Sequence, residues 1–196
     1  SIVGSKAQKQ AGTDAPTQIK RRLVTRDDQD SLLTRDRAAS LYFHSQAEAG
    51  WDTYDASKLF PLTAPGDPYA TIAPLGTGSD EAMEPKAVES RSKNVESVDI
   101  PLELRASEGL QGTMTIDAPV WENVPEGWTV ELIDTKGTDE SEDDVFHTLG
   151  PDGAGYSFTY NASGSEAVRN RTDKTTPSSE RKTPALRSSG LSMQPR

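Results

Sequence analysis

The residues best suited to chemistry lie in the stretch "AGWDTYDASKLFP", residues 49 to 61, where aromatic rings alternate with carboxylates. Trp51 and Tyr54 offer flat apolar faces of the kind that stack on a sugar ring. Asp52 and Asp55 offer acceptors for hydrogen bonds from sugar hydroxyl groups. One interpretation of this stretch is therefore a glycan-binding site built from these four residues, with Trp121 or Trp128 as a further stacking platform.

The same stretch also has a structural interpretation, which we favour. Asp55 is suited to cap a single helical turn through the backbone amides of Ser57 or Lys58, with Lys58 one turn along. The stretch would then be a corner that packs against the strands carrying Leu41 and Leu102. The residues expected to fall inward in this corner are Trp51, Leu59 and Phe60.

Other candidates for catalysis are weak. The two histidines, His44 and His147, are a hundred residues apart on two expected strands, so we interpret each as structural or solvent-facing. The segment "GYSFT" lacks the second glycine and the strand-to-helix turn of a nucleophile elbow. The segment "GTGSD" lacks the third glycine of a dinucleotide fingerprint and the lysine of a P-loop. We therefore expect no enzyme, no catalytic residue and no cofactor.

Two acidic runs could offer oxygen ligands to calcium, "TDESEDD" at 138 to 144 and "RDDQD" at 26 to 30. Neither has the spacing of an EF-hand, so we interpret both as solvated loops and expect no metal. The chain has no cysteine, which excludes disulfides, cysteine zinc sites and thiol nucleophiles.

Charge divides the chain into two chemically different parts. Residues 1 to 160 hold 14 Lys and Arg against 28 Asp and Glu, a balance of −14, whereas residues 161 to 196 hold seven against three, a balance of +4. The acidic body would repel phosphates, so we expect no nucleic acid partner. No apolar run is long enough for a membrane helix, so we expect no membrane insertion. Without a signal peptide or initiator Met, the chain is expected to be a processed product or an excised piece.

Hydropathy with a period of two predicts an all-β fold. In "VDIPLELR", Val98, Ile100, Leu102 and Leu104 alternate with polar residues, and Pro101 predicts a sheet edge or an interrupted ladder. The other expected strands are 18–25, 39–46, 112–116, 128–134, 144–149 and 156–160. Their rhythm is typical of an antiparallel β-sandwich, jelly-roll or immunoglobulin-like.

The remaining segments are expected to contribute little. Residues 76 to 94, with Pro85 in the middle, are interpreted as a long loop. Residues 161 to 196 contain 11 Ser or Thr and no aromatic residue, so disorder is expected and deletion should leave stability unchanged. The expected organisation is a flexible lead-in over 1–17, a sandwich module over 18–160, and a basic Ser/Thr/Pro-rich tail over 161–196 that is either disordered or extended.

Three stretches in order resemble a known family: "GWDTYDASKLFP", "DIPLELRASEGLQGTMTI" and "VELIDTKGTDESEDDVFHTLGPDGAGYSF". They are similar to the β-sandwich module that precedes the C-terminal sorting domain in type IX-secreted surface proteins of Bacteroidota-type bacteria. The resemblance covers about residues 18 to 160. The family's last strand usually ends in Arg-Phe, whereas this chain continues with Arg169-Asn170 and a Ser/Pro-rich tail. We therefore expect the sorting signal to be missing or lost, and the export route is implied by the resemblance only.

The positions of this chain that match the family's motif fall in every one of the three stretches. They are Gly50, Asp52, Tyr54, Asp55, Ala56, Lys58 and Leu59, then Ile100 to Leu102, Gly112 to Thr115, Leu132 to Asp134, Tyr156 and Phe158. The resemblance implies no catalytic residues. It implies a non-catalytic extracellular or cell-surface module whose partners are other domains or subunits of a larger protein. The alternative is a carbohydrate-binding module with a glycan as its partner, which rests on the aromatic residues described above and not on the resemblance.

Overall fold

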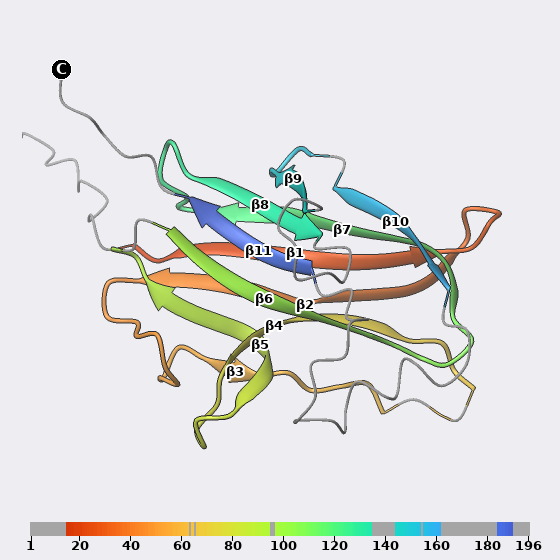
Figure 1. Cartoon of the computed structure of the whole chain (residues 1–196), viewed down its shortest axis with the longest axis horizontal. Helices are drawn as coiled ribbons and strands as arrows, with labels where there is room; N and C mark the ends of the chain where they lie inside the picture. Colours follow the sequence, from red (N-terminus) through yellow and green to blue (C-terminus); the bar gives the residue numbers. More distant parts are fainter. Residues whose placement is uncertain are drawn as a thin grey trace, which may run out of the picture.

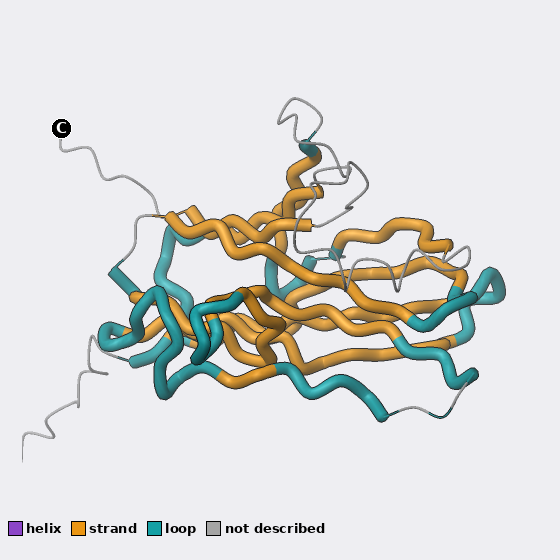
Figure 2. Tube along the Cα trace, turned by 60° about the horizontal axis from the view of Figure 1, so that its bottom comes forward, coloured by secondary structure: helices purple, strands orange, loops and turns teal. Residues whose placement is uncertain are grey.

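The computed structural model describes residues 15–62, 64, 66–94, 97–134, 144–153, 155–161 and 184–189. Within these ranges every regular element is a β-strand, as predicted (Figure 1). Figure 2 shows the same part of the chain as strands joined by loops and turns, with no helix. It follows that no described helix could cross a bilayer.

Eleven strands follow one another along the described part of the chain. They are β1 Thr17–Arg26, β2 Leu32–His44, β3 Ala56–Ser57, β4 Ala70–Thr77, β5 Met83–Ser92, β6 Ser97–Ala106, β7 Gln111–Glu122, β8 Thr129–Asp134, β9 Val145–Leu149, β10 Tyr156–Asn161 and β11 Pro184–Ser189.

Eight of these strands form a strongly curled sheet in the order β10-β7-β1-β2-β5-β4-β6, with β3 also paired to β5. Strands β8 and β9 form a small two-stranded sheet, and β11 pairs with both β6 and β8. The pair β2 and β5 is parallel, and the other pairs are antiparallel. The expected purely antiparallel arrangement is therefore corrected to a mixed one.

Strands β9 and β10 meet, although they lie at opposite ends of the complete strand order that runs on from β6 through β11 and β8 to β9. His147 on β9 stacks on Tyr156 on β10, with ring centroids 4.0 Å apart. The Tyr156 hydroxyl donates a hydrogen bond of 2.5 Å to Asp134 Oδ2 at the end of β8. Tyr156, Phe158 and Tyr160 share one half-buried face of β10 that packs on the core, which confirms the prediction that they cover it.

One hydrophobic cluster fills the space inside the curl, and it takes residues from both sheets. Its fully buried members include Ile19, Leu41, Leu102, Ile116 and Leu132, which lie on β1, β2, β6, β7 and β8. Inward residues recur at every second position of β1, as the sequence pattern predicts. This alternation sets which side chains face the interior, including polar ones.

Pro101 lies where β6 changes partner. Residues 97 to 101 pair with β11, and residues 102 to 106 pair with β4. Because proline lacks an amide hydrogen, it fits at this break. The predicted interruption of the ladder at Pro101 is confirmed.

One expectation about the sequence is wrong. Residues 83–92, expected as part of a long loop, form β5, whose parallel partner β2 lies far away in the chain. Residues 184–189 of the tail, expected to be disordered or extended, form β11 (Figure 1, blue). Strand β4, which precedes β5, was not predicted at all. In β4, β5 and β11, apolar and polar residues do not alternate regularly. Pairing with neighbouring strands, and not the pattern of each segment, therefore determines that these segments are strands.

Gly155 sets the start of β10, and replacing it with alanine should destabilise the fold. Its φ is +77°, and a Cβ atom there would lie 2.6 Å from the carbonyl oxygen of Ile116. We expect Gly155→Ala to lower the free energy of unfolding by about 1 to 3 kcal/mol. Urea denaturation measures the change. Gly50→Ala is the matched control, because nothing lies within 4 Å of its added Cβ; equal losses in the two variants would contradict the prediction.

Candidate functional site: a buried charge cluster beneath Trp51

The two carboxylates of the opening stretch hold the corner in place. Asp52 accepts hydrogen bonds from the amides of Tyr54 (2.7 Å) and Glu48 (2.8 Å) and from the Ser90 hydroxyl (3.0 Å). Asp55 accepts from the amide of Asp52 (3.0 Å) and from the amide of Ser90 on β5 (2.7 Å). Both carboxylates therefore shape the turn and fasten it to β5. The partners of Asp55 are not the amides of Ser57 or Lys58, so that detail of the corner prediction is wrong.

These hydrogen bonds also set the charge of Asp52. Burial raises the pKa of this carboxyl, but the amides of Glu48 and Tyr54 and the Ser90 hydroxyl donate to its ionised form. The net effect holds the pKa of Asp52 below its ordinary value. At neutral pH this carboxylate is therefore ionised and bound by the protein.

The aromatic part of the corner prediction is wrong. Trp51 is 40% exposed and Leu59 is 88% exposed, while Phe60 is half-buried against the Arg105 guanidinium, 4.0 Å from its ring centroid. Lys58 takes the inward position instead and is 7% exposed. An ammonium group occupies the interior here because the Asp36 carboxylate and the Ala38 carbonyl oxygen of β2 meet it, which the local sequence does not reveal.

Lys86 lies directly beneath Trp51. Its side chain is fully buried, and its Nζ lies 4.0 Å from the centroid of the Trp51 ring. Nζ donates a hydrogen bond of 2.7 Å to the carbonyl oxygen of Thr77 on β4 and lies 3.5 Å from Asp55 Oδ2. A buried ammonium needs such partners. Lys86 thus joins β4, β5 and the corner at one point, and its cation–π contact holds one face of the indole.

Glu89, three residues further along β5, completes this cluster. Its carboxylate is 1% exposed, forms an ion pair with Arg91, and lies 4.0 Å from Lys86 Nζ. A Cβ atom on Gly76 would lie 1.8 Å from Glu89 Oε2, so glycine makes room for the carboxylate. Burial raises the pKa of Glu89 to about 7; Asp55 adds to the rise, and Arg91 and Lys86 oppose it. Glu89 is the cluster's group that titrates near neutral pH.

A fully buried arginine on β1 faces the same interior. The three guanidinium nitrogens of Arg21 have no hydrogen-bond partner among the described residues. Burial lowers the pKa of Arg21 to about 9, and the nearby negative charge of Glu89 opposes that change. Arg21 is therefore charged at neutral pH, and Glu89 compensates this charge through space in proportion to the fraction of its carboxyl that is ionised.

A second buried ion pair links the corner to β2. Lys58 Nζ donates to Asp36 Oδ2 and to the carbonyl oxygen of Ala38, both at 2.6 Å. Asp36 Oδ2 also accepts from the amide of Ile72 on β4, at 2.9 Å. Burial lowers the pKa of Lys58, against the effect of Asp36. Asp36 lies beside the irregularity in the β1–β2 pairing, so this pair supports β2 where its ladder is distorted.

Tyr54 belongs to a separate aromatic group. Its ring lies 5.8 Å from Tyr42 and 4.8 Å from His44, measured between centroids, and its hydroxyl donates to Gln46 Oε1 at 3.2 Å. Trp51 has no recorded ring contact with Tyr54 among the described residues. The structure therefore brings Asp52 and Asp55 together with Trp51 through Lys86 and places Tyr54 in a neighbouring stack.

The other candidate residues fall elsewhere. Trp121 donates from Nε1 to the carbonyl oxygen of Ala118, and Trp128 packs edge-on against Phe43 at 5.0 Å, so both are half-buried structural side chains. Residues 138 to 143 of the longer acidic run lie outside the described residues. In the run at 26 to 30, Asp27 caps the hairpin turn. Among the described residues, no group of three His, Asp or Glu side chains is placed to hold a metal ion.

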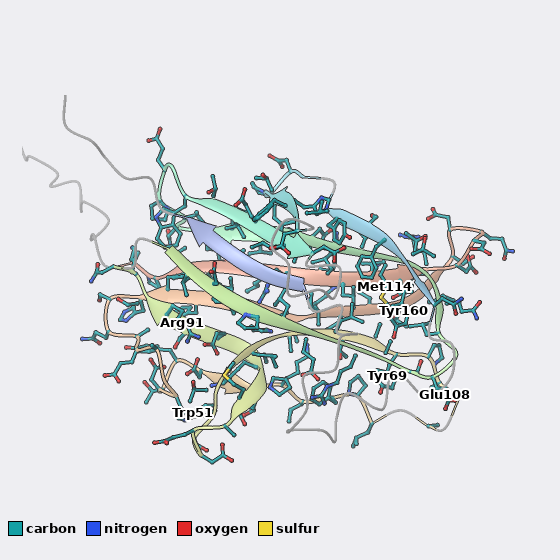
Figure 3. All side chains as sticks on the ribbon, viewed as in Figure 1. Trp51, Tyr69, Arg91, Glu108, Met114 and Tyr160 are labelled. Atoms are coloured by element: carbon teal, nitrogen blue, oxygen red, sulfur yellow. The ribbon has the colours of Figure 1, made fainter. Side chains whose placement is uncertain are left out.

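The buried cluster lies toward one end of the molecule. Trp51 and Arg91 mark this end in Figure 3, and Glu108 marks the other. A shallow depression near Glu108 is also lined by Leu33, Pro68 and Leu110. No protein-family model, no curated protein and no solved structure matches the chain.

Sequence reasoning missed Lys86, Glu89 and Arg21 as members of this site. For Arg21 a signal existed, because it lies between Ile19 and Leu23 in the alternating pattern and so shares their inward face. For Lys86 and Glu89 no signal existed, because the segment that contains them was interpreted as a loop.

Asp55→Asn should destabilise the protein strongly. The change removes the negative charge opposite Lys86 and replaces one carboxylate oxygen with an NH2 group, which cannot accept the hydrogen bond that the Asp52 or Ser90 amide donates. We expect a loss of about 2 to 4 kcal/mol in the free energy of unfolding, measured by chemical denaturation. Asp28→Asn, at an exposed turn position, is the control and should change it by less than about 0.5 kcal/mol. A small effect at both positions would refute the structural role of Asp55.

Glu89→Gln should change how stability depends on pH. A carboxyl whose pKa is raised in the folded state binds more protons folded than unfolded, so its contribution is fully present below the unfolded pKa and falls as pH rises toward about 7. Relative to wild type, we therefore expect Glu89→Gln to be more favourable at about pH 8 than at about pH 5, by up to about 3 kcal/mol. Denaturation curves at both pH values measure it. The same comparison for Glu122→Gln, an exposed residue on β7, should show no such difference.

Proposed function

We propose that this chain is a non-catalytic structural and interaction module of a larger secreted or cell-surface protein. The observation that carries this proposal is the use made of its buried charges. Asp52 and Asp55 bind backbone amides, and Lys58 and Lys86 bind carbonyl oxygens and carboxylates of other strands. These groups hold β2, β4, β5 and the corner together, so their role is structural.

The finer form of the proposal is a β-sandwich, jelly-roll or immunoglobulin-like, that resembles the module before the sorting domain of type IX-secreted surface proteins. The order of the three matching stretches supports it, as does a single core that takes residues from β1, β2 and β7 and from β6 and β8. In this proposal the module lies outside the cell, and its partners are neighbouring domains or subunits.

A carbohydrate-binding module is the second candidate, and one observation favours it. The Trp51 ring is 40% exposed and rests on the buried Lys86 ammonium, so its indole is held in place with surface left open. A fixed, exposed indole is what stacking on a sugar requires. Asp52 and Asp55 would act only indirectly, because the protein already uses their oxygens.

A comparison of glycan binding by the wild-type chain and by the Trp51→Ala variant distinguishes the two candidate functions. Glycan arrays and polysaccharide pull-downs should show no specific binding by the wild-type chain, and Trp51→Ala should leave that result unchanged. Because Trp51 is partly exposed, its truncation should cost about 0.5 to 2 kcal/mol of stability, and not the larger cost of a core aromatic. Leu59→Ala, an exposed apolar residue of the same corner, is the control.

Specific sugar binding that is lost in a folded Trp51→Ala variant, and kept in Leu59→Ala, would overturn the structural proposal in favour of the second candidate. The genetic test is independent. The reading frame should extend upstream into a large exported protein, and a frame that encodes this chain alone without an export segment would contradict the proposal.

A further inference from the structure

The most unusual feature of the sheet is the position of β11. This strand comes from the tail, yet it lies between β6 and β8 and pairs antiparallel with both (Figure 1). The chain reaches it after 22 residues, 162 to 183, that follow the end of β10. A segment distant in sequence thus occupies an interior position in the strand order.

The backbone of β11 satisfies two strand edges at once. Residues 129–134 of β8 and 97–101 of β6 both take β11 as the partner on the sides that face each other. Among the described strands, β11 is also the only one whose pairing joins the two-stranded sheet of β8 and β9 to the eight-stranded sheet. Without a strand here, two facing edges would present unpaired amides and carbonyls to an incoming chain.

The register shows what kind of segment this position accepts. Residues that pair across β6, β11 and β8 form rows that run across the three strands. In one row, Leu186 pairs with Ile100 on β6 and Leu132 on β8, which are 1% and 0% exposed and belong to the core. The next row places Arg187 between Asp99 and Glu131. Position 99 is exposed and position 131 is half-buried, so this row belongs to the outer face. The register therefore places position 186 in line with core residues of both neighbouring strands and position 187 in line with residues of the outer face.

We propose that the gap between β6 and β8 is a strand-acceptor site that takes residues 184–189 of a second copy of this chain as well as those of its own. The ladder and the rows are the same whichever copy supplies the strand, as in domain swapping. Charge favours the encounter, because the body carries −14 and the tail +4. This interaction goes beyond the function proposed above and does not depend on where the protein lies.

The tethered strand has the advantage at low concentration. A connection of this length gives the chain's own strand an effective concentration on the order of 1 mM. Exchange between copies should therefore become measurable only when the protein approaches that concentration. At micromolar concentrations the chain should be monomeric.

Disulfide trapping between full-length copies tests the site directly, because the natural chain has no cysteine. One copy carries Glu131→Cys and the other Arg187→Cys, positions that lie opposite each other in the β8–β11 register. The two are mixed at about 1 mM, allowed to exchange, and oxidised. We expect a covalent dimer in at least about tenfold greater yield than from Glu131→Cys mixed with Asp28→Cys, an exposed turn position away from this site.

Two further variants make each result decisive. Glu131→Cys and Arg187→Cys in one chain should give a monomeric disulfide at micromolar concentration, which reports the strand in its own chain. Adding Leu186→Pro to the Arg187→Cys copy removes an amide hydrogen from the strand and should abolish the dimer. A monomeric disulfide without the dimer overturns exchange between copies, and absence of both overturns the acceptor site itself. Equal dimer yields with Asp28→Cys would also overturn it. None of these results bears on glycan binding or gene context, so the function proposed above fails or stands separately.

Discussion

The interior of this small β-protein must neutralise charges that it does not expose to water. A buried ammonium or guanidinium costs several kcal/mol unless opposite charges and hydrogen bonds meet it. Here those partners come from different strands, so the requirement fixes how the corner, β2, β4 and β5 are assembled. The buried cations are Arg21, Lys58 and Lys86, and the carboxylates that compensate them are Asp36, Asp55 and Glu89.

This requirement explains features that hydrophobic burial alone does not. The parallel pairing of β2 with β5 brings Glu89 and Ser90 beneath the corner, where Asp55 binds the Ser90 amide. Gly76 on β4 leaves the space that Glu89 occupies. Trp51 covers the Lys86 ammonium from outside. The exposed indole is thus a consequence of the charges below it, and its availability to a ligand is a separate property.

Much of the all-β fold could be predicted from period-two patterns. Ile19 and Leu23 on β1, and Leu41 and Phe43 on β2, share inward faces as expected. The site could be predicted only in part. Asp55 was recognised as shaping a corner, whereas Asp52 was recognised only as a candidate ligand-binding group. Their shared partner Ser90 lies on β5, which has no alternating apolar pattern. Pairing between distant segments determines β4, β5 and β11, and single-strand patterns carry no information about such pairing.

The interaction between Asp55 and Lys86 is the most direct point at which to test this account. A double-mutant cycle with Asp55→Asn and Lys86→Met, followed by chemical denaturation at neutral pH, measures their coupling free energy. Because both groups are buried and 3.5 Å apart, a coupling of about 1 to 3 kcal/mol is predicted. A coupling near zero, with additive losses, would contradict the claim that this buried charge cluster holds the corner on the sheet.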